Sequence, residues 1–187
     1  MIRCTLVILT LFFASLSVIA ADPTPDDAFN LLNKLKIKYR KDKKGNGITI
    51  VDLSRKKITD NDLKTLAALK SVHDLNLSGP IARTSGDKII YEAKQISDEG
   101  LKNIAGMTEL RQLTLDGTHV TDAGLKHLLG MKKLQNLVLS DTKVTDSGME
   151  TLTKLPALRN LNLLNTKVTE TGIGVLKRWK SELKINH

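Results

Sequence analysis

The 187-residue sequence contains one cysteine, and aromatic residues make up only 3% of it. A single cysteine cannot form an internal disulfide and cannot build a zinc site alone. Because aromatic side chains are scarce, stacking platforms that bind single-stranded nucleic acids or flat sugar faces are disfavoured. The 41% of apolar residues excludes a disordered chain, and the 26% of charged residues excludes a polytopic membrane protein. The length suits one domain or a small array of repeats.

Residues 1–21 have the pattern of a secretory signal peptide. Arg3 is the only charged residue before Asp22, an apolar stretch covers residues 5–19, and two alanines follow it. That succession is typical of a signal peptide and its cleavage site. It predicts a secreted or periplasmic protein whose mature chain has no transmembrane span and, with Cys4 removed, no cysteine. The alternative is an uncleaved N-terminal membrane anchor.

A 24-residue pattern recurs three times without gaps, in residues 110–133, 134–157 and 158–181. Each copy places two leucines two residues apart, and further columns hold threonine, valine and glycine. Weaker copies occupy residues 48–71 and 72–109, the second with 14 additional residues, and a partial copy follows the last full one. Self-similarity at a fixed period of this length indicates stacked structural repeats.

The pattern resembles the leucine-rich repeat family in its bacterial L-x-x-L-x-L-x-x-T-x-V-T-D-x-G-L-x-x-L form, over residues 48–187. The resemblance implies an α/β solenoid with one parallel sheet on the concave face and helices on the convex face. Thr118, Thr142 and Thr166 stand where many family members have asparagine. The side-chain ladder that family members form at this turn would therefore have to use hydroxyl groups.

The residues themselves point to the same architecture. Leucines two positions apart face one side of a short strand, and the following V-T-D-x-G-L segment switches to helical spacing. Thr121 and Thr145 stand where a helix N-cap belongs, and Asp122 and Asp146 follow them. Gly148 falls inside the first helical turn, where glycine costs about 1 kcal/mol relative to alanine. We expect a close approach between helix and strand to compensate.

The two ends of the array carry further predictions. Residues 25–39 have the apolar spacing of an amphipathic helix, with acids first and lysines last. This helix, within an N-terminal unit over residues 22–47, is expected to cap the first repeat. Its alternative role is a basic helix that binds a membrane surface or a partner. Trp179 occupies the column of Met131 and Leu155, which predicts that it belongs to the core.

The strand positions between the leucines are the candidate binding face. In stacked repeats these side chains form the concave surface of the sheet. Here they are short and mostly neutral polar groups, which could hydrogen-bond to the backbone of a partner. The candidate contacts are Asp52, Asp74, Asn76, Gln112, Thr114, Asp116, Asn136, Val138, Ser140, Asn160 and Asn162. The alternative is that they are solvated strand residues without a ligand.

The additional residues of the second repeat form an insertion over residues 79–95. Residues 81–84 and 88–91 flank a Ser-Gly-Asp turn signal, so we expect them to pair as a hairpin beside the sheet edge. Insertions into repeats are often binding elements, which adds Arg83 and Tyr91 to the candidate contacts. The alternative is a loop packed on its neighbours.

No catalytic, metal-binding or phosphate-binding motif occurs in the sequence. We therefore expect no catalytic residue, no cofactor and no metal. The sequence favours a non-enzymatic exported protein that binds a protein or peptide through the concave face and the insertion, and it disfavours nucleic acid as a partner. One alternative is a basic protein that binds acidic envelope polymers or membranes through residues 34–44, which hold seven Lys or Arg and one Asp. The other is an enzyme whose site follows no known pattern.

Overall fold

The computed structural model describes residues 22–187 except 46, 55, 80, 86–87 and 93–94, so the predicted signal peptide lies outside the described residues. The helical elements are α1 (Pro25–Lys34), α2 (Asp60–Leu66), α3 (Asp98–Ile104), α4 (Asp122–Leu125) with η1 (Lys126–Gly130), η2 (Asp146–Gly148) with α5 (Met149–Thr153), and α6 (Glu170–Trp179). The strands are β1 (Tyr39–Lys41), β2 (Ile48–Asp52), β3 (Asp74–Asn76), β4 (Ile81–Ser85), β5 (Lys88–Glu92), β6 (Gln112–Thr114), β7 (Asn136–Val138), β8 (Asn160–Asn162) and β9 (Lys184–Asn186).

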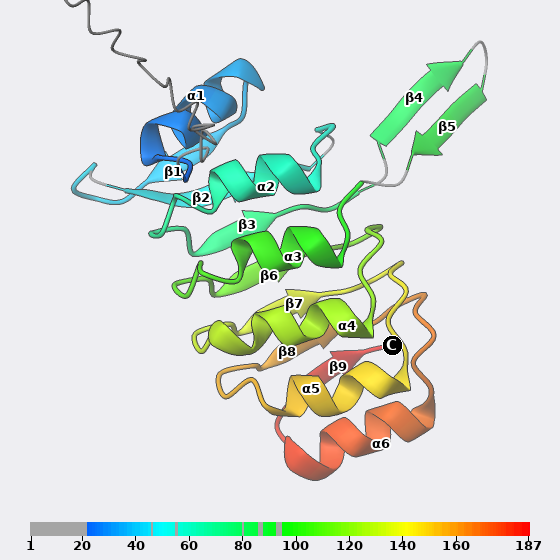
Figure 1. Ribbon diagram of the computed structural model, residues 1–187. Helices are drawn as coiled ribbons and strands as arrows, with labels where there is room; N and C mark the ends of the chain where they lie inside the picture. Colours follow the sequence, from blue (N-terminus) through cyan, green and yellow to red (C-terminus); the bar gives the residue numbers. More distant parts are fainter. Residues whose placement is uncertain (1–21, 46, 55, 80, 86–87, 93–94) are drawn as a thin grey trace, which may run out of the picture.

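The architecture is a stack of strand–helix units, with the sheet on one side and the helices on the other (Figure 1). The main sheet has seven strands in the order β1-β2-β3-β6-β7-β8-β9. Strands β2 to β9 of this sheet are parallel, and only β1 pairs antiparallel with its neighbour β2. The expected α/β solenoid is confirmed. Each repeat helix, from α2 to α6, runs back against the direction of the parallel strands. The parallel strands therefore all begin at one edge of the molecule and end at the other, whereas β1 runs the opposite way.

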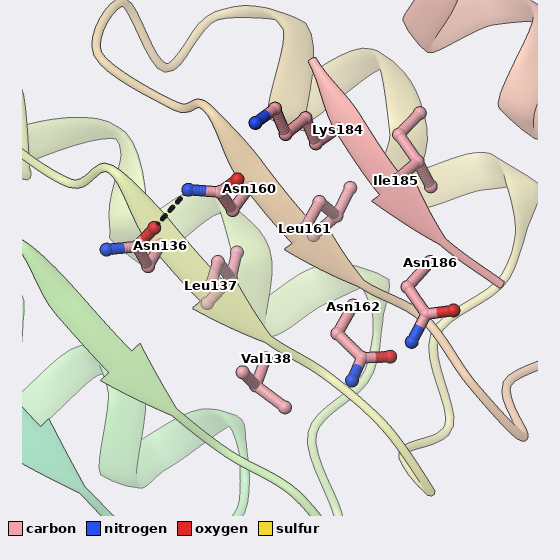
Figure 2. Close-up of a pocket in the computed structure, with 9 residues that line it drawn as sticks. All are labelled: Asn136, Leu137, Val138, Asn160, Leu161, Asn162, Lys184, Ile185 and Asn186. Atoms are coloured by element: carbon pink, nitrogen blue, oxygen red, sulfur yellow. Dashed lines mark hydrogen bonds between the residues drawn. The ribbon is translucent and has the colours of Figure 1, made fainter.

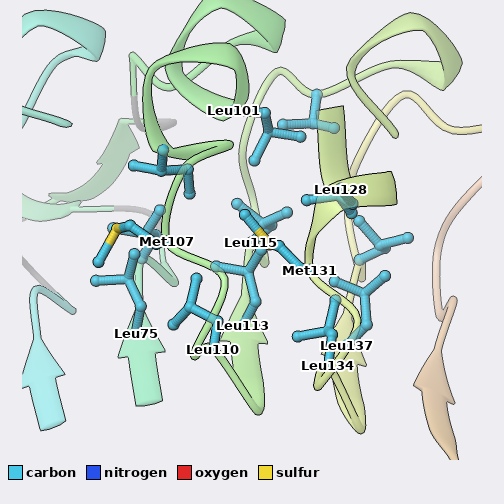
Figure 3. Close-up of a cluster of buried hydrophobic side chains, with 14 of the residues drawn as sticks. Leu75, Leu101, Met107, Leu110, Leu113, Leu115, Leu128, Met131, Leu134 and Leu137 are labelled. Atoms are coloured by element: carbon cyan, nitrogen blue, oxygen red, sulfur yellow. The ribbon is translucent and has the colours of Figure 1, made fainter. Parts of the chain in front are cut away.

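The leucine columns form the core of the solenoid. Leu75, Leu113, Leu137 and Leu161 pair in successive strands, and none is more than 2% exposed. Figure 3 shows Leu75, Leu113 and Leu137 filling the space between strands and helices, together with Leu101, Met107, Leu128 and Met131. Each large apolar side chain that is fully buried contributes about 1.5–3 kcal/mol. The predicted buried row of leucines is therefore confirmed.

The threonines at the strand-end turn do not form a ladder between repeats. The Thr118 hydroxyl donates to the Leu115 carbonyl at 2.6 Å, and the Thr142 hydroxyl donates to the Leu139 carbonyl at 2.6 Å. Both bonds lie inside one repeat, because a threonine side chain is shorter than an asparagine side chain and reaches only its own turn. The expectation of a hydroxyl ladder at this position is wrong.

The ladder between repeats lies instead at the helix N-termini. The Asp122 carboxylate accepts both the backbone N–H of Thr145, at 2.9 Å, and its hydroxyl, at 2.6 Å. The Thr145 hydroxyl in turn accepts the N–H of Ser147 at 3.3 Å, so it caps its own helix. The same carboxylate-to-cap pairs are Asp60 with Ser97, Asp98 with Thr121, and Asp146 with Thr169.

These pairs explain the glycine in the first turn of each helix. A Cβ atom on Gly148 would lie 2.4 Å from Oδ1 of Asp122 and 2.7 Å from Cδ1 of Leu125, both in the preceding repeat. Cβ atoms on Gly100, Gly124 and Gly172 would meet the equivalent aspartates at 2.2–2.3 Å. The close approach is therefore between neighbouring helices. The expectation that it lies between helix and strand is wrong.

The N-terminal helix is shorter than the sequence predicts. It ends at Lys34, Lys36 follows with a φ of 51°, and Tyr39 belongs to strand β1 instead of the helix. Ala28 and Leu32 on α1 are fully buried and belong to the same core cluster as the side chains of the first repeat. Strand β1 adds a second cover, because it pairs along the outer edge of β2.

Trp179 is not a core residue. Its side chain is 72% exposed, whereas Met131 and Leu155 in the same sequence column are fully buried. In the earlier repeats the helical segment ends at Gly130 or Thr153, before this column. Helix α6 continues to Trp179 itself, which leaves the indole on the surface. Leu183, four residues later, is buried in the core, with 7% of its surface exposed.

Candidate functional site

The strand residues between the leucines form two rows on the concave face. In register, the first row is Ile50, Asp74, Gln112, Asn136, Asn160 and Lys184, and the second is Asp52, Asn76, Thr114, Val138, Asn162 and Asn186. All twelve side chains are exposed or half-buried. The structure thus brings together nine of the candidate contacts named from the sequence on one continuous surface.

The first row contains a chain of side-chain amides. The Nδ2 group of Asn136 donates to Oε1 of Gln112 at 3.0 Å, and the Nδ2 group of Asn160 donates to Oδ1 of Asn136 (Figure 2). The three amides therefore orient one another across strands β6, β7 and β8. Each keeps unused hydrogen-bonding capacity, because an amide group offers two donors and two acceptor lone pairs.

The second row is held by turns within each repeat. Oδ1 of Asp52 accepts the N–H of Ser54 at 2.9 Å, and Oδ1 of Asn76 accepts the N–H of Ser78 at 2.9 Å. Oδ1 of Asn162 accepts the N–H of Leu164 at 3.1 Å. These bonds fix the side-chain orientation and use only the oxygen of each asparagine amide, whose NH2 group offers two further donors.

Two shallow hollows lie on this face. One of about 250 Å³ is lined by β7, β8 and β9 and includes Asn136, Val138, Asn160, Asn162 and Asn186 (Figure 2). The other, of about 230 Å³, is lined by β2, β3 and β6 and includes Asp52, Asp74 and Gln112. The surface can therefore seat short side chains from a partner at two places.

The charges on the concave face are unevenly distributed. Asp52, Asp74 and Asp116 lie towards the N-terminal strands, and Lys184 lies on the last strand. Burial raises the pKa of Asp116, and the nearby negative charge of Asp141 raises it further. Asp116 is thus partly desolvated, whereas the strand residues exposed on β7 and β8 are neutral.

Asp116 and Ser140, the two candidate contacts in the strand-end turns, differ in how much of their side chain a partner could reach. Asp116 is half-buried, but Ser140 is only 6% exposed. Ser140 therefore offers little surface to a partner and is removed from the candidate set. The reason is that the strand-end turns stack closely, with the carbonyl of Ser140 accepting the N–H of Gly117 at 3.0 Å.

The sequence reasoning missed several residues of this face. Lys38 and Arg40 line a hollow of about 240 Å³ with Ile50 and Asp52, because β1 extends the sheet by one antiparallel strand. No repeat signal could place this strand, since it lies outside the 24-residue pattern. Lys184 and Asn186, by contrast, stand in the columns of Asn160 and Asn162 and could have been found from the partial last copy.

The basic segment 34–44 does not form one surface. Lys34 and Lys36 lie at the edge where the strands end, near Leu35, whose carbonyl accepts Nζ of Lys56 at 2.9 Å. Arg40 adjoins the concave face, and Lys43 and Lys44 lie in the turn between β1 and β2 at the opposite edge. The single basic surface predicted for this segment is therefore divided among three places.

The insertion forms a hairpin, as expected, with β4 antiparallel to β5. In register, Arg83 pairs with Ile90 and Tyr91 pairs with Ala82. The hairpin is a separate two-stranded sheet and extends beyond the edge at which the main strands end (Figure 1). It does not pair beside the main sheet, so Arg83 and Tyr91 belong to a second candidate surface away from the concave rows.

Among the described residues, no group of three or more His, Cys, Asp or Glu side chains could hold a metal ion. In the same part of the chain, no helix has the length and apolar character needed to cross a membrane. The described polar groups of the concave face act as hydrogen-bond donors and acceptors, and their arrangement suits recognition of another chain.

Comparison with known proteins places the fold. No family model matches the sequence, and no curated protein matches it. Solved structures do match, among them the crystal structure of an internalin, InlF, from Listeria monocytogenes, with 23% sequence identity and a TM-score of 0.50. The match covers 70% of this chain and 32% of the internalin chain, so the matched region is about a third of that protein. The fold is a leucine-rich-repeat solenoid.

Proposed function

We propose that this protein is an exported, non-enzymatic interaction module that binds a protein or peptide through the concave face of its sheet. The chain of amides from Gln112 through Asn136 to Asn160 supports the proposal most directly. These groups are preoriented by their mutual hydrogen bonds, so they lose little conformational freedom when a partner binds. A peptide backbone offers the alternating N–H and C=O groups that such amides can pair with.

Export is proposed from the signal-peptide pattern of residues 1–21. The internalin-like fold is a second reason to favour an interaction role over catalysis. N-terminal sequencing of the protein recovered from culture medium and from envelope fractions tests the location. A mature chain that begins near Asp22 supports export, and an intact chain in the cytosol contradicts it.

The binding face is tested by a pair of charge insertions. Asn136→Arg with Asn160→Arg breaks the amide chain and places two bulky cations on the concave face. Asn30→Arg with Asn61→Arg makes the same chemical change on exposed positions of α1 and α2. We expect partners captured from an envelope extract by the wild-type protein to be lost with the first variant and retained with the second. Equal capture by both variants would remove the concave face from consideration.

The hairpin formed by β4 and β5 is proposed as an additional contact element. Replacement of residues 81–92 by a short Gly-Ser linker leaves the main sheet unchanged, because the hairpin does not pair with it. We expect reduced capture of the same partners with an unaltered melting temperature. Unchanged capture would restrict the binding surface to the concave rows.

A further inference from the structure

One edge of the solenoid gathers positive charge from the N-terminal unit and from three of the repeats. This edge, at the left in Figure 1, contains the starts of the parallel strands, the ends of the helices and the turn between β1 and β2. The exposed cations there include Lys43 and Lys44 in the β1–β2 turn, Lys70 after α2, Lys132 after η1, Arg159 before β8 and Arg178 in the last turn of α6. We call these six residues the basic edge.

The basic edge follows from the way the helices are aligned. All repeat helices end at this edge, and the carbonyl groups at a helix C-terminus favour positive side chains. The acids gather at the other edge, where Asp60, Asp98, Asp122 and Asp146 hold the N-caps of the following repeats. The protein is therefore polarised across its width, even though its whole-chain charge is only moderately positive.

The acids on the same edge do not cancel the cations. Glu109 is held by Lys133, whose Nζ lies 2.7 Å from Oε1 of Glu109. The other acids at this edge are Asp22, Asp42 and Glu182. Asp42 lies between Lys41 and Lys43, and Glu182 lies two residues from both Lys180 and Lys184. None of the six cations of the basic edge takes part in an ion pair with another described residue.

Trp179 lies at the end of the basic edge. Its indole is 72% exposed and follows Arg178 directly, with Lys180 next in the chain. An exposed tryptophan flanked by cations suits the headgroup region of a lipid bilayer, where the amphipathic ring and the positive side chains both find favourable surroundings. Among the described residues, the other exposed large apolar side chain is Leu164, which lies at the opposite edge beyond β8.

The described chain also begins next to this edge. Asp22 and Pro23 line a hollow of about 470 Å³ together with Lys70, at the end of α2, and with Lys64 and Lys102. The apolar stretch 5–19 directly precedes them in the sequence. Any membrane-associated segment ahead of residue 22 would therefore deliver the solenoid to the bilayer with its basic edge nearby.

We propose that the basic edge, with Trp179, docks the protein on the surface of an anionic lipid bilayer. The seven strands stand about 4.8 Å apart, so the edge from β1 to β9 is about 29 Å long. In this orientation the strands rise from the bilayer, the concave face opens sideways, and the β4–β5 hairpin points away from the lipid. Docking is independent of the proposed concave-face function, since it uses none of the same residues.

The test is partitioning onto vesicles of the protein from Asp22 onward, where the proposed mature chain begins. Every variant begins at Asp22, so the apolar stretch 5–19 contributes nothing to the partitioning. The edge variant carries Lys70→Gln, Lys132→Gln, Arg159→Gln and Arg178→Gln. The control carries Lys34→Gln, Lys57→Gln, Lys143→Gln and Lys167→Gln, which removes the same charge from exposed positions at the edge where the strands end. Vesicles of equal parts phosphatidylglycerol and phosphatidylcholine are compared with pure phosphatidylcholine.

We expect the wild-type protein to partition more strongly onto anionic than onto neutral vesicles, and the difference to shrink between about 0.1 M and about 1 M salt as charges are screened. Each basic residue at an anionic surface contributes a factor of about five, so the edge variant should lose partitioning by about 100-fold or more. The control variant should lose much less. Equal behaviour of the two variants would overturn the proposal.

Trp179 supplies an independent reading, because it is the only tryptophan of the chain. On anionic vesicles its emission should shift to shorter wavelength and be quenched by brominated lipid. Binding to soluble dextran sulfate without any emission shift on vesicles would assign the edge to a linear polyanion and overturn the lipid proposal. Trp179→Ala should weaken partitioning several-fold with no change in melting temperature, which separates docking from folding.

Discussion

The carboxylate of Asp122 accepts two hydrogen bonds from Thr145, the N-cap of the next helix, one from its backbone N–H and one from its hydroxyl. This pair joins two repeats that are otherwise connected by apolar packing and by the sheet. It also makes the helix N-cap of one repeat depend on the side chain of the repeat before it. The relationship recurs at four interfaces, so it is a general element of cohesion in this solenoid.

Substitution of Asp122 by alanine should destabilise the protein. The change leaves the N–H and the hydroxyl of Thr145 without their charged acceptor, and hydrogen bonds to charged groups are worth about 1.5–3 kcal/mol each at partly buried sites. Because water can reach the site, we expect a loss of about 1.5–3 kcal/mol in total. Urea unfolding measures it, with the exposed Asp26→Ala on α1 as control. A loss no larger than that of the control would show that the ladder contributes nothing.

Two glycine substitutions should change stability in opposite directions. Gly148→Ala gains helix propensity but places a methyl group 2.4 Å from Asp122 Oδ1 and 2.7 Å from Leu125 Cδ1, so we expect net destabilisation by more than about 1 kcal/mol. Gly174→Ala on α6 has no atom within 4 Å and should stabilise the protein by about 0.5–1 kcal/mol. Thermal and urea unfolding of the two single variants provide the comparison. If both substitutions stabilise, the close helix approach does not constrain this position.

The contact of Asp146 predicts a dependence of stability on pH. Hydrogen bonds from the Thr169 hydroxyl and backbone lower the pKa of Asp146 in the folded protein. A carboxyl with a lowered folded-state pKa stabilises the protein above its ordinary pKa, and this stabilisation disappears as the pH falls through the folded-state value. In Asp146→Asn the stability at neutral pH should be reduced, and the difference from wild type should narrow in acid. Parallel pH profiles for the two proteins would refute the assignment.

Asp116 should behave in the opposite sense. Burial and the charge of Asp141 raise the pKa of Asp116, so its ionised form is less favourable in the folded than in the unfolded protein. Asp116→Asn should therefore raise the melting temperature at neutral pH, and the gain should vanish at a pH below the ordinary carboxyl range. Asp26→Asn, which makes the same chemical change at an exposed site, is the matched control. A lower melting temperature for Asp116→Asn at neutral pH would contradict the prediction.

Residues in one sequence column need not have one structural role, and Trp179 and Leu155 allow a direct test. Leu155→Ala removes a fully buried side chain and should cost about 2–5 kcal/mol. Trp179→Ala removes a side chain that is 72% exposed and should change stability by less than about 0.5 kcal/mol. Urea unfolding of the two variants distinguishes these outcomes. A cost above about 2 kcal/mol for Trp179→Ala would place the indole in the core.

The solenoid could be predicted from the sequence because its signal is repeated. Each leucine column is sampled several times, so the buried row through Leu113, Leu137 and Leu161 follows from period alone. The outward rows follow from the same alternation, which is why most candidate contacts do lie on one surface. Their mutual hydrogen bonds, such as that between Asn136 and Gln112, depend on the spacing of neighbouring strands and could only be seen in three dimensions.

The departures from the predictions lie where a residue has no equivalent in other repeats or a long-range neighbour decides its role. Strand β1 lies outside the repeat, so nothing in the sequence period indicated it. Trp179 was assigned by its column, but the longer α6 helix changes its surroundings. Gly148 was correctly associated with a close approach, yet the partner was misassigned, because the Asp122 carboxylate comes from 26 residues earlier in the chain.

The Asp-to-Thr pairs give the array a direction. Thr59, the first N-cap of the repeats, bonds to Asp62 of its own helix, with its N–H at 2.8 Å and its hydroxyl at 2.9 Å. Glu170, in the place of the next aspartate, instead lies 2.8 Å from Nε2 of His187. Removal of repeats from the C-terminal side would thus leave every remaining N-cap with its aspartate. Removal from the N-terminal side would instead leave the N-cap Ser or Thr of the new first repeat without the carboxylate that accepts its hydrogen bonds. Shortened versions of this protein should tolerate loss at one terminus far better than loss at the other.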